Sequence, residues 1–208
     1  MITQEVADAV TSINIHAGMA EGANVKSLAG LEVFKNMTSF AFVGTTQFDD
    51  VDLSGCTALT TITVSPSKGY NTIKLPAGVV SFTSVCSDAA SIGPKELDLT
   101  AYTNLETVDV GGTSWGSGSK ALVSLNCKGL AKLKLIRAAF ASAKTINISG
   151  CDLLQGYVGA QAAEGANLPF DQRGATIIVG SQEQYDALRS SWYDYYGESP
   201  YCEMKIEE

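Results

Sequence analysis

The sequence has few of the residues on which most enzymes depend. Its 208 residues include a single histidine, and only 17% of them are charged. A Ser-His-Asp or Cys-His site would need that one imidazole, His16, beside a nucleophile, and no residue near it in sequence supplies the other roles. We therefore expect His16 to be an exposed surface residue and hydrolysis through histidine to be excluded.

Long apolar runs and an excess of positive charge are also missing. No stretch approaches the roughly 18 consecutive apolar residues of a membrane span, and the first residues are not a basic segment followed by an apolar one. The 14 Lys and Arg against 22 Asp and Glu give a formal net charge of -8, which repels phosphate backbones and anionic lipid. We expect a soluble chain with no nucleic-acid partner and no direct membrane insertion. A signal or lipid anchor would lie upstream of this sequence.

The cysteines do not have the spacing of a disulfide scaffold or a zinc site. They number five, so they cannot all pair, and none forms a CxxC pair. Cys56 and Cys151 fall three residues after an apolar strand position and Cys127 falls in an inward one, so we interpret them as buried thiols that fill the core. A metal or redox ladder is the alternative, but Gly78 and Tyr102 take the equivalent places between them. We expect no metal and no cofactor.

A block of apolar residues at fixed spacing repeats along the chain. It reads VDLSGCTALTTITV from Val51, LDLTAYTNLETVDV from Leu97 and, one residue shorter, LNCKGLAKLKL from Leu125. A fourth copy opens as INISGCDLL from Ile146 and decays after Tyr157. Weaker copies extend the apolar marker to first positions 10, 37, 59, 80, 105, 130 and 154, in steps of 21 to 27 residues. Such steps are typical of leucine-rich repeats.

The spacing within each copy predicts short strands. Apolar residues alternate with Thr, Asp, Lys or Ser, which is the period of a half-buried strand, and the same alternation occurs about 11 residues earlier. The sequence therefore predicts a leucine-rich-repeat solenoid that is mostly β with little helix, with about seven stacked coils and a C-terminal helical cap. We divide this single domain into a lead-in over 1–9, repeats over 10–175 and a strand-helix cap over 176–208.

The C-terminal segment has the pattern of a cap. A last strand is expected over 176–179, and Ser181 lies three residues before Gln184, as in a capping box that opens a helix. One face of that helix carries Tyr185, Leu188 and Trp192. An aromatic cluster and an acidic tail from Glu203 to Glu208 follow.

These repeats resemble those of bacterial leucine-rich-repeat surface proteins of the BspA-like kind. The resemblance rests on VDLSGCTALTTITV, ELDLTAYTNLETVDV, IKLPAGVVSFTSV and the closing TIIVGSQEQYDALRSSW, and it covers about residues 10 to 195. Residues 17–36 and 111–121 fit the repeat poorly, and 155–174 do not fit it. The resemblance implies an exported protein on the cell surface, often lipid-anchored, with a role in adhesion or protein binding.

The positions between the apolar residues of the marker strands predict an outward face of the sheet. In chain order these pairs are Ser12/Asn14, Ser39/Ala41, Thr61/Thr63, Phe82/Ser84, Thr107/Asp109 and Lys132/Lys134. Small hydroxyl side chains leave a flat face that can accept a partner, although solubility alone also selects Ser and Thr there. The candidate binding residues on this face are Thr61, Thr63, Thr107, Asp109, Lys132 and Lys134.

A seventh candidate lies in a glycine-rich stretch. Trp115 falls between Gly111 and Lys120, in a segment that lacks the G-K-[ST] ending of a phosphate-binding loop. Its indole could stack on a partner or a sugar, or pack under the adjacent coil.

Together these features predict a non-catalytic binding or adhesion module of an exported bacterial protein that mediates protein–protein interaction. The partner would be a protein or glycan ligand outside the cell. The alternative is a carbohydrate-binding surface module of a glycan-uptake system, with Trp115, Trp192 and the tyrosines stacking on sugar rings. A glycosidase would need two carboxylates about 5 to 10 Å apart in a cleft, which the repeats give no sign of building.

Overall fold

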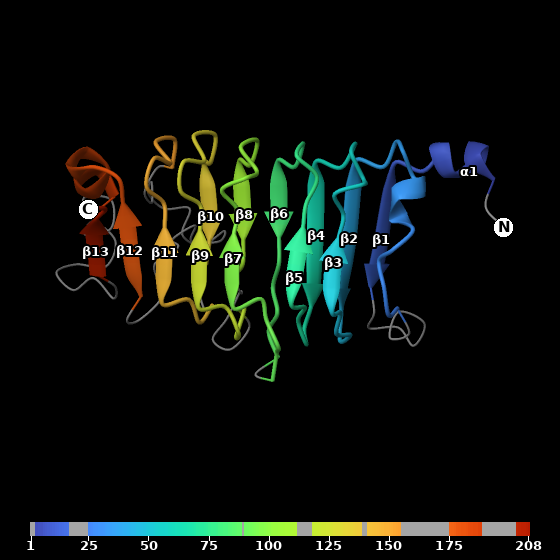
Figure 1. Ribbon diagram of the computed structural model, residues 1–208, viewed down its shortest axis with the longest axis horizontal. Helices are drawn as coiled ribbons and strands as arrows, with labels where there is room; N and C mark the ends of the chain where they lie inside the picture. The colour runs from blue at the N-terminus through green and yellow to red at the C-terminus, as the bar shows by residue number, and fades with distance from the viewer. Residues whose placement is uncertain are drawn as a thin grey trace, which may run out of the picture.

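The chain folds into stacks of short parallel strands. A computed structural model describes residues 3–16, 25–88, 90–111, 118–138, 141–154, 175–188 and 203–208. Within these ranges every strand pair is parallel. A six-stranded sheet has the order β1-β2-β4-β6-β8-β10, a five-stranded sheet the order β13-β12-β11-β9-β7, and a two-stranded sheet pairs β3 with β5. Figure 1 shows the strands side by side along the long axis of the molecule.

The strands are short, and helix is scarce. The six-stranded sheet consists of β1 (Ser12–His16), β2 (Ser39–Gly44), β4 (Thr61–Pro66), β6 (Ser81–Thr83), β8 (Thr107–Asp109) and β10 (Leu135–Arg137). The other two sheets consist of β3 (Asp50–Asp52), β5 (Thr72–Lys74), β7 (Glu96–Asp98), β9 (Ser124–Asn126), β11 (Thr145–Asn147), β12 (Thr176–Val179) and β13 (Glu203–Ile206). Helical segments are α1 (Gln4–Asp8), the 3-10 turn η2 (Leu31–Val33) and a helix over 182–188. The predicted mostly β structure with little helix is confirmed, and the structure adds that the paired strands are parallel.

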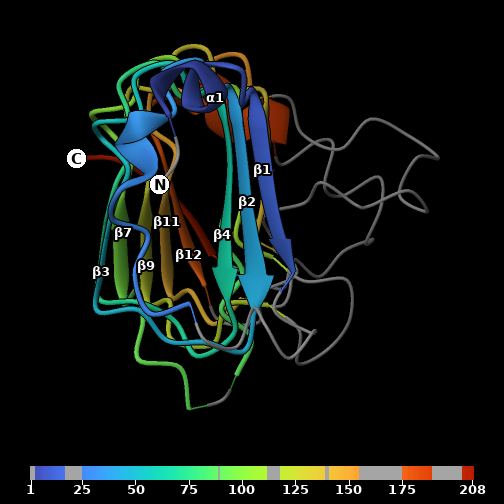
Figure 2. The ribbon, with the colours of Figure 1, turned by 90° about the vertical axis from the view of Figure 1, so that its right-hand side faces the viewer.

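The sheets form two facing layers. Figure 2 shows β1, β2 and β4 in one layer and β3, β7, β9, β11 and β12 in the other. The chain crosses from the second layer to the six-stranded sheet and back, and returning strands pair with the strand formed one round earlier, except that β7 does not pair with β5. Stacking of this kind is required because one round cannot enclose its own leucines, whereas neighbours about 4.8 Å apart bury them in a continuous column.

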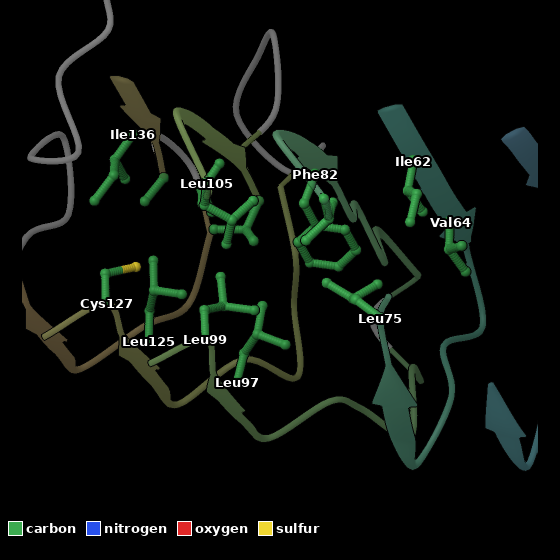
Figure 3. Close-up of a cluster of buried hydrophobic side chains, with 14 of the residues drawn as sticks. Ile62, Val64, Leu75, Phe82, Leu97, Leu99, Leu105, Leu125, Cys127 and Ile136 are labelled. Atoms are coloured by element: carbon green, nitrogen blue, oxygen red, sulfur yellow. The ribbon is translucent and has the colours of Figure 1, made fainter. Parts of the chain in front are cut away.

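The core lies between the layers. The central inward residues of the six-stranded sheet, among them Ile62, Phe82 and Ile136, are aligned across neighbouring strands and almost fully buried. Leu97 and Leu125 pair in the opposite layer and are buried in the same column. In Figure 3 the side chains from the two layers point toward one another. Close packing of this kind makes each position sensitive to volume.

Repeated turns at one corner fix the true register of the repeats. The Cys56 N–H donates to the Leu53 carbonyl and the Leu59 N–H to the Cys56 carbonyl, both at 3.0 Å. The same pair of bonds recurs at residues 99, 102 and 105, at 127, 130 and 133, and at 148, 151 and 154. Cys56, Tyr102, Leu130 and Cys151 are therefore equivalent, as are Leu59, Leu105, Leu133 and Leu154.

This equivalence corrects the repeat expected from Leu125. The block is not one residue shorter: Leu133 and Ile136 are the inward residues, and Ala138 follows where the other copies have valine. Because Ala138 is small, it did not stand out as an apolar strand residue in the sequence. Leu135, one residue before Ile136, fitted the apolar spacing instead. A second slip concerns β6, where Val79, Phe82 and Ser84 face inward instead of Val80, Thr83 and Val85. The buried Ser84 is polar, but its hydroxyl is 2.6 Å from the Tyr70 hydroxyl, so it is satisfied.

Asp and Asn residues close the turns after the second-layer strands. Oδ1 of Asp52, Asp98, Asn126 and Asn147 each accepts the backbone N–H two residues later, at 3.0 to 3.2 Å. Hydrogen bonds from the Ser54 and Thr100 hydroxyl and N–H groups lower the pKa values of Asp52 and Asp98, respectively. The Asp/Asn of the repeat is thus a turn-closing residue.

The C-terminal end adds two strands and a docked helix. The expected strand over 176–179 and the helix after Ser181 are confirmed: Ser181 Oγ accepts the Gln184 N–H at 3.1 Å. The Gln184 side chain also donates to the Ile148 carbonyl at 2.9 Å, which ties the helix to the preceding round. Leu188 is buried, whereas Trp192 lies outside the described residues.

The predicted acidic tail is wrong. Residues Glu203–Ile206 form strand β13, which pairs with β12 in register. Met204 packs against the core between the exposed Glu203 and Lys205, so the segment has the alternation of a strand. The two glutamates that follow Ile206 made this short alternation easy to miss.

Candidate functional site

The outer face of the six-stranded sheet carries two rows of side chains aligned across the strands. The first row contains Ser12, Ser39, Thr61, Ser81, Thr107 and Leu135. The second row contains Asn14, Ala41, Thr63, Thr83, Asp109 and Arg137. Parallel pairing sets the spacing between neighbours in a row at about 4.8 Å.

The first row is a line of hydroxyl groups over five strands. Thr61 is exposed, while Ser39, Ser81 and Thr107 are half-buried among their neighbours. The Thr107 hydroxyl donates to the Ser81 oxygen at 2.8 Å, so these two members of the row bond to each other. β-branched or short side chains on a paired strand have few rotamers, and the row is therefore flat and stiff.

The only charged side chains of the second row are Asp109 on β8 and Arg137 on β10. Asp109 Oδ2 lies 3.8 Å from Arg137 Nη1, and its Oδ1 accepts the Gly111 N–H at 3.0 Å. Burial raises the pKa of Asp109, and the Gly111 hydrogen bond and the Arg137 charge only partly oppose that effect. This half-buried carboxylate and guanidinium can offer a partner both an acceptor and donors of hydrogen bonds.

Four of the predicted residues lie together on this face. Thr61 and Thr63 are on β4, and Thr107 and Asp109 are on β8, two strands away. The structure adds Ser81 and Thr83 between them, in place of the predicted Phe82 and Ser84, which are buried. One residue of slip in the predicted register accounts for this exchange, because neighbouring residues of a strand point to opposite faces.

The prediction that Lys132 and Lys134 lie on this face is wrong. Both precede β10 and lie at the corner, where Lys132 Nζ donates to Asn104 Oδ1 and Lys134 Nζ to Glu106 Oε2, each at 2.7 Å. Leu135 and Arg137 occupy the positions expected for them. An alignment that placed Leu133 with Leu59 would have identified Arg137 from the sequence.

Trp115, the remaining candidate, lies outside the described residues, as does Trp192. Described tyrosines serve packing: Tyr70 is buried against Ser84, the Tyr102 hydroxyl accepts the Leu75 N–H at 3.0 Å, and Tyr185 packs against the core. The sugar-stacking prediction therefore depends on the two tryptophans and on the tyrosines that lie outside the described residues.

The described cysteines are buried and unpaired. They are Cys56, Cys86, Cys127 and Cys151. The Cys151 Sγ donates to the Cys127 carbonyl at 3.0 Å, and burial raises the pKa of Cys86 to about 12 and that of Cys151 to about 11. Over the described ranges, no three His, Cys, Asp or Glu side chains are grouped so that they could hold a metal ion. These thiols fill core positions, as the sequence predicted.

His16 ends β1 and is exposed, as expected. In the part of the chain that the structure describes, no helix is long and apolar enough to cross a membrane.

The sequence matches no protein-family model, and no curated protein matches it either. The outer face of the six-stranded sheet is therefore the feature from which function is argued.

Proposed function

We propose that the chain is a leucine-rich-repeat solenoid of the BspA-like kind, with about seven coils, and that it acts as a non-catalytic binding or adhesion module outside a bacterial cell. The observation that carries the proposal is the pair of aligned rows on the outer face of the six-stranded sheet. Five steps of about 4.8 Å make this face about 24 Å wide, which suits a broad protein contact better than a small ligand.

The physical state of this face favours binding. Its side chains are short and held by a close-packed core, so little conformational entropy is lost when a partner covers them. A flat hydroxyl surface gives weak, distributed contacts, and the Asp109–Arg137 pair at one end gives a directional one. The proposed partner is a folded protein whose polar surface places complementary groups opposite that pair.

A matched pair of variants tests this proposal. Thr63→Arg places a long charged side chain in the middle of the outer face, and Thr145→Arg does the same on the five-stranded sheet; both threonines are half-buried outward residues. The chain and both variants are applied to arrays of extracellular proteins and of glycans. We expect protein ligands whose binding falls at least about tenfold with Thr63→Arg and not with Thr145→Arg.

Other results would contradict the proposal in distinguishable ways. Equal losses in both variants would place binding elsewhere on the chain. Binding to glycans alone, insensitive to Thr63→Arg, would favour the carbohydrate-binding alternative and the tryptophans and tyrosines outside the described residues.

A further inference from the structure

The first round of the stack leaves its apolar residues incompletely covered. Ile13 and Ile15 of β1 are only partly buried, as are Val25, Leu31 and Phe34, which lie between β1 and β2 in the chain. The corresponding inward residues of β2, Phe40 and Phe42, are almost fully buried. Val6 of α1 and Val33 of η2 are 57% and 43% exposed at the same end of the molecule. Among the described residues, the apolar column is thus open on the β1 side.

The outer edge of β1 is also available for pairing. In the described structure, β1 pairs with β2 alone; Figure 2 shows β1 as the foremost strand of its layer, and Figure 1 shows α1 beyond its upper end rather than along it. The Thr11 carbonyl accepts the Ser39 N–H, so by alternation in the parallel ladder the N–H and C=O groups of Ser12, Asn14 and His16 point away from β2. Three residues of backbone donors and acceptors are therefore presented at this edge.

Nothing in the β1 sequence protects this edge. Ser12–His16 contains no proline, lysine, aspartate or glutamate, the residues that usually blunt an exposed edge strand. The edge strand at the other end, β13, carries Glu203 and Lys205, which are both exposed. An edge strand that is free to pair, beside apolar residues that are only partly buried, is typical of a surface that binds another protein chain.

We propose that β1 pairs antiparallel with β1 of a second copy of this chain, about a two-fold axis at Asn14. The axis places Ser12 opposite His16 of the second copy, and Asn14 opposite its equivalent. These are the residues whose backbone groups point outward, so the three pairs form about six hydrogen bonds.

The strand is self-complementary in this arrangement, which is why a second copy is the occupant. Ile13 lies opposite Ile15 of the second copy on the inward face, so the apolar columns of the two chains join across the axis. On the outward face the paired residues are uncharged, so the two copies meet without like-charge repulsion. An axis perpendicular to the sheet also keeps both outer faces on one side, which makes a twelve-stranded sheet.

The pairing of β1 strands does not depend on the proposed function, but it would change how the outer face binds a partner. Two copies of the outer face, side by side and facing the same way, can engage a repetitive partner at two points. Bivalent contact raises avidity without any new contact to the ligand.

Sedimentation equilibrium of the whole chain tests the pairing. We expect a reversible monomer–dimer equilibrium up to about 100 µM. Asn14→Pro removes an outward N–H that β2 does not use, so it should leave a folded chain that stays monomeric. Asn14→Lys places two charges opposite each other and should raise the dimer dissociation constant at least about tenfold. Thr145→Lys, an outward position on the five-stranded sheet, is the matched control and should leave the dimer dissociation constant unchanged.

Mixing two variants shows whether residue 14 faces itself. Asn14→Lys and Asn14→Glu should each dimerise poorly, but their equimolar mixture should form mixed dimers with a dissociation constant within about threefold of the original. The melting temperatures of the variants report whether each is folded. A chain that stays monomeric at about 500 µM, dimers that persist with Asn14→Pro, or a mixture that stays monomeric would overturn the proposal.

Discussion

The two ends of the strand stack solve the same problem differently. A column of stacked rounds ends in bare leucines and unpaired backbone groups, and both must be covered. At the C-terminal end, β13 adds a charged edge strand, and the helix over 182–188 is tied to Ile148 by Gln184. At the N-terminal end, α1 and η2 leave Ile13 and Ile15 half-exposed. In the described structure, the five-stranded sheet is closed at its C-terminal end within the chain, and the N-terminal end is open to a second copy.

The C-terminal closure also has an electrostatic clamp. Lys128 Nζ lies 2.7 Å from Glu207 Oε1, and the Glu207 N–H donates to the Val179 carbonyl at 2.7 Å, so the last residues are held to two earlier rounds. The hydrogen bond from Lys128 is the main reason that the pKa of Glu207 is lowered. No described charged pair joins β1 to another strand.

Truncation at each end should give the largest contrast. Deleting residues 176–208 exposes the β11 edge and removes the buried Ile177, Val179 and Leu188 from the core, so we expect aggregation or a melting temperature lower by about 10 °C or more. Deleting residues 1–9 removes mainly exposed residues and should lower it by less than about 5 °C. Differential scanning calorimetry measures both. A soluble C-terminal truncation with an unchanged melting temperature would show that this segment does not close the stack.

Two matched isoleucine substitutions sharpen the comparison. Ile177 of β12 is fully buried one strand from the C-terminal edge, so Ile177→Ala should reduce the free energy of unfolding by about 2 to 5 kcal/mol. Ile13 of β1 is half-exposed, so Ile13→Ala should reduce it by about 1 kcal/mol in the monomer. Urea denaturation at low protein concentration measures both values. Equal effects would mean that the two ends are equally covered.

Thiol chemistry should report the same difference. Cys151 is buried near the closed end, and burial raises its pKa, so Ellman's reagent should label it only at the rate of global unfolding. Ile15→Cys, made in a Cys202→Ser chain so that the other thiols are the four buried ones, should react within seconds in the monomer and more slowly at concentrations that favour the dimer. Rapid labelling of Cys127 or Cys151 in the native chain would contradict the packing described for them.

The smallest expected effect is on the stability of the folded chain at low pH. The pKa of Asp98 in the folded chain lies below its ordinary value of 3.8, because Thr100 donates to the carboxylate. The stabilisation is therefore present above that value and is lost as pH falls through the lower, folded-state pKa. Asp98→Asn keeps an acceptor, as Asn126 and Asn147 do, and should change stability at neutral pH by less than about 0.5 kcal/mol.

That substitution should also flatten the loss of stability below about pH 4. Asp98→Ala removes the acceptor and should be destabilising by about 1 kcal/mol at neutral pH. Urea titrations at several pH values measure both variants. An Asp98→Asn chain with unchanged acid sensitivity would mean that this turn does not contribute to it.

The sequence predicted the mostly β architecture because the apolar spacing is strong where the repeats are regular. It could not decide between adjacent apolar residues: Val79 and Val80 both fit the pattern, and only packing selects Val79. Ser84 faces inward because Tyr70, fourteen residues earlier, provides a hydroxyl partner, which spacing alone does not reveal.

The binding face was predicted in part for the same reason. Thr61, Thr63, Thr107 and Asp109 belong to regular copies, so their outward placement follows from period two. Arg137 was missed because Ala138 gave too weak an apolar signal to mark the strand, and the lysines before it were chosen instead. The contrast between the ends was not predicted, since edge pairing depends on neighbours that the sequence does not specify.

Amide hydrogen exchange resolved by residue tests the central claim, that the stack is closed at β13 and open at β1, most directly. At low protein concentration, we predict that amides of Ile177 and Ile178 in β12 exchange as slowly as those of β4 and β8, while those of Ser12 and Asn14 exchange quickly. At high concentration, the Ser12, Asn14 and His16 amides should become protected, with those of Ile13 and Ile15 changing less. Slow exchange of Ser12 and Asn14 at low concentration, or exchange at β1 that is independent of concentration, would contradict this account.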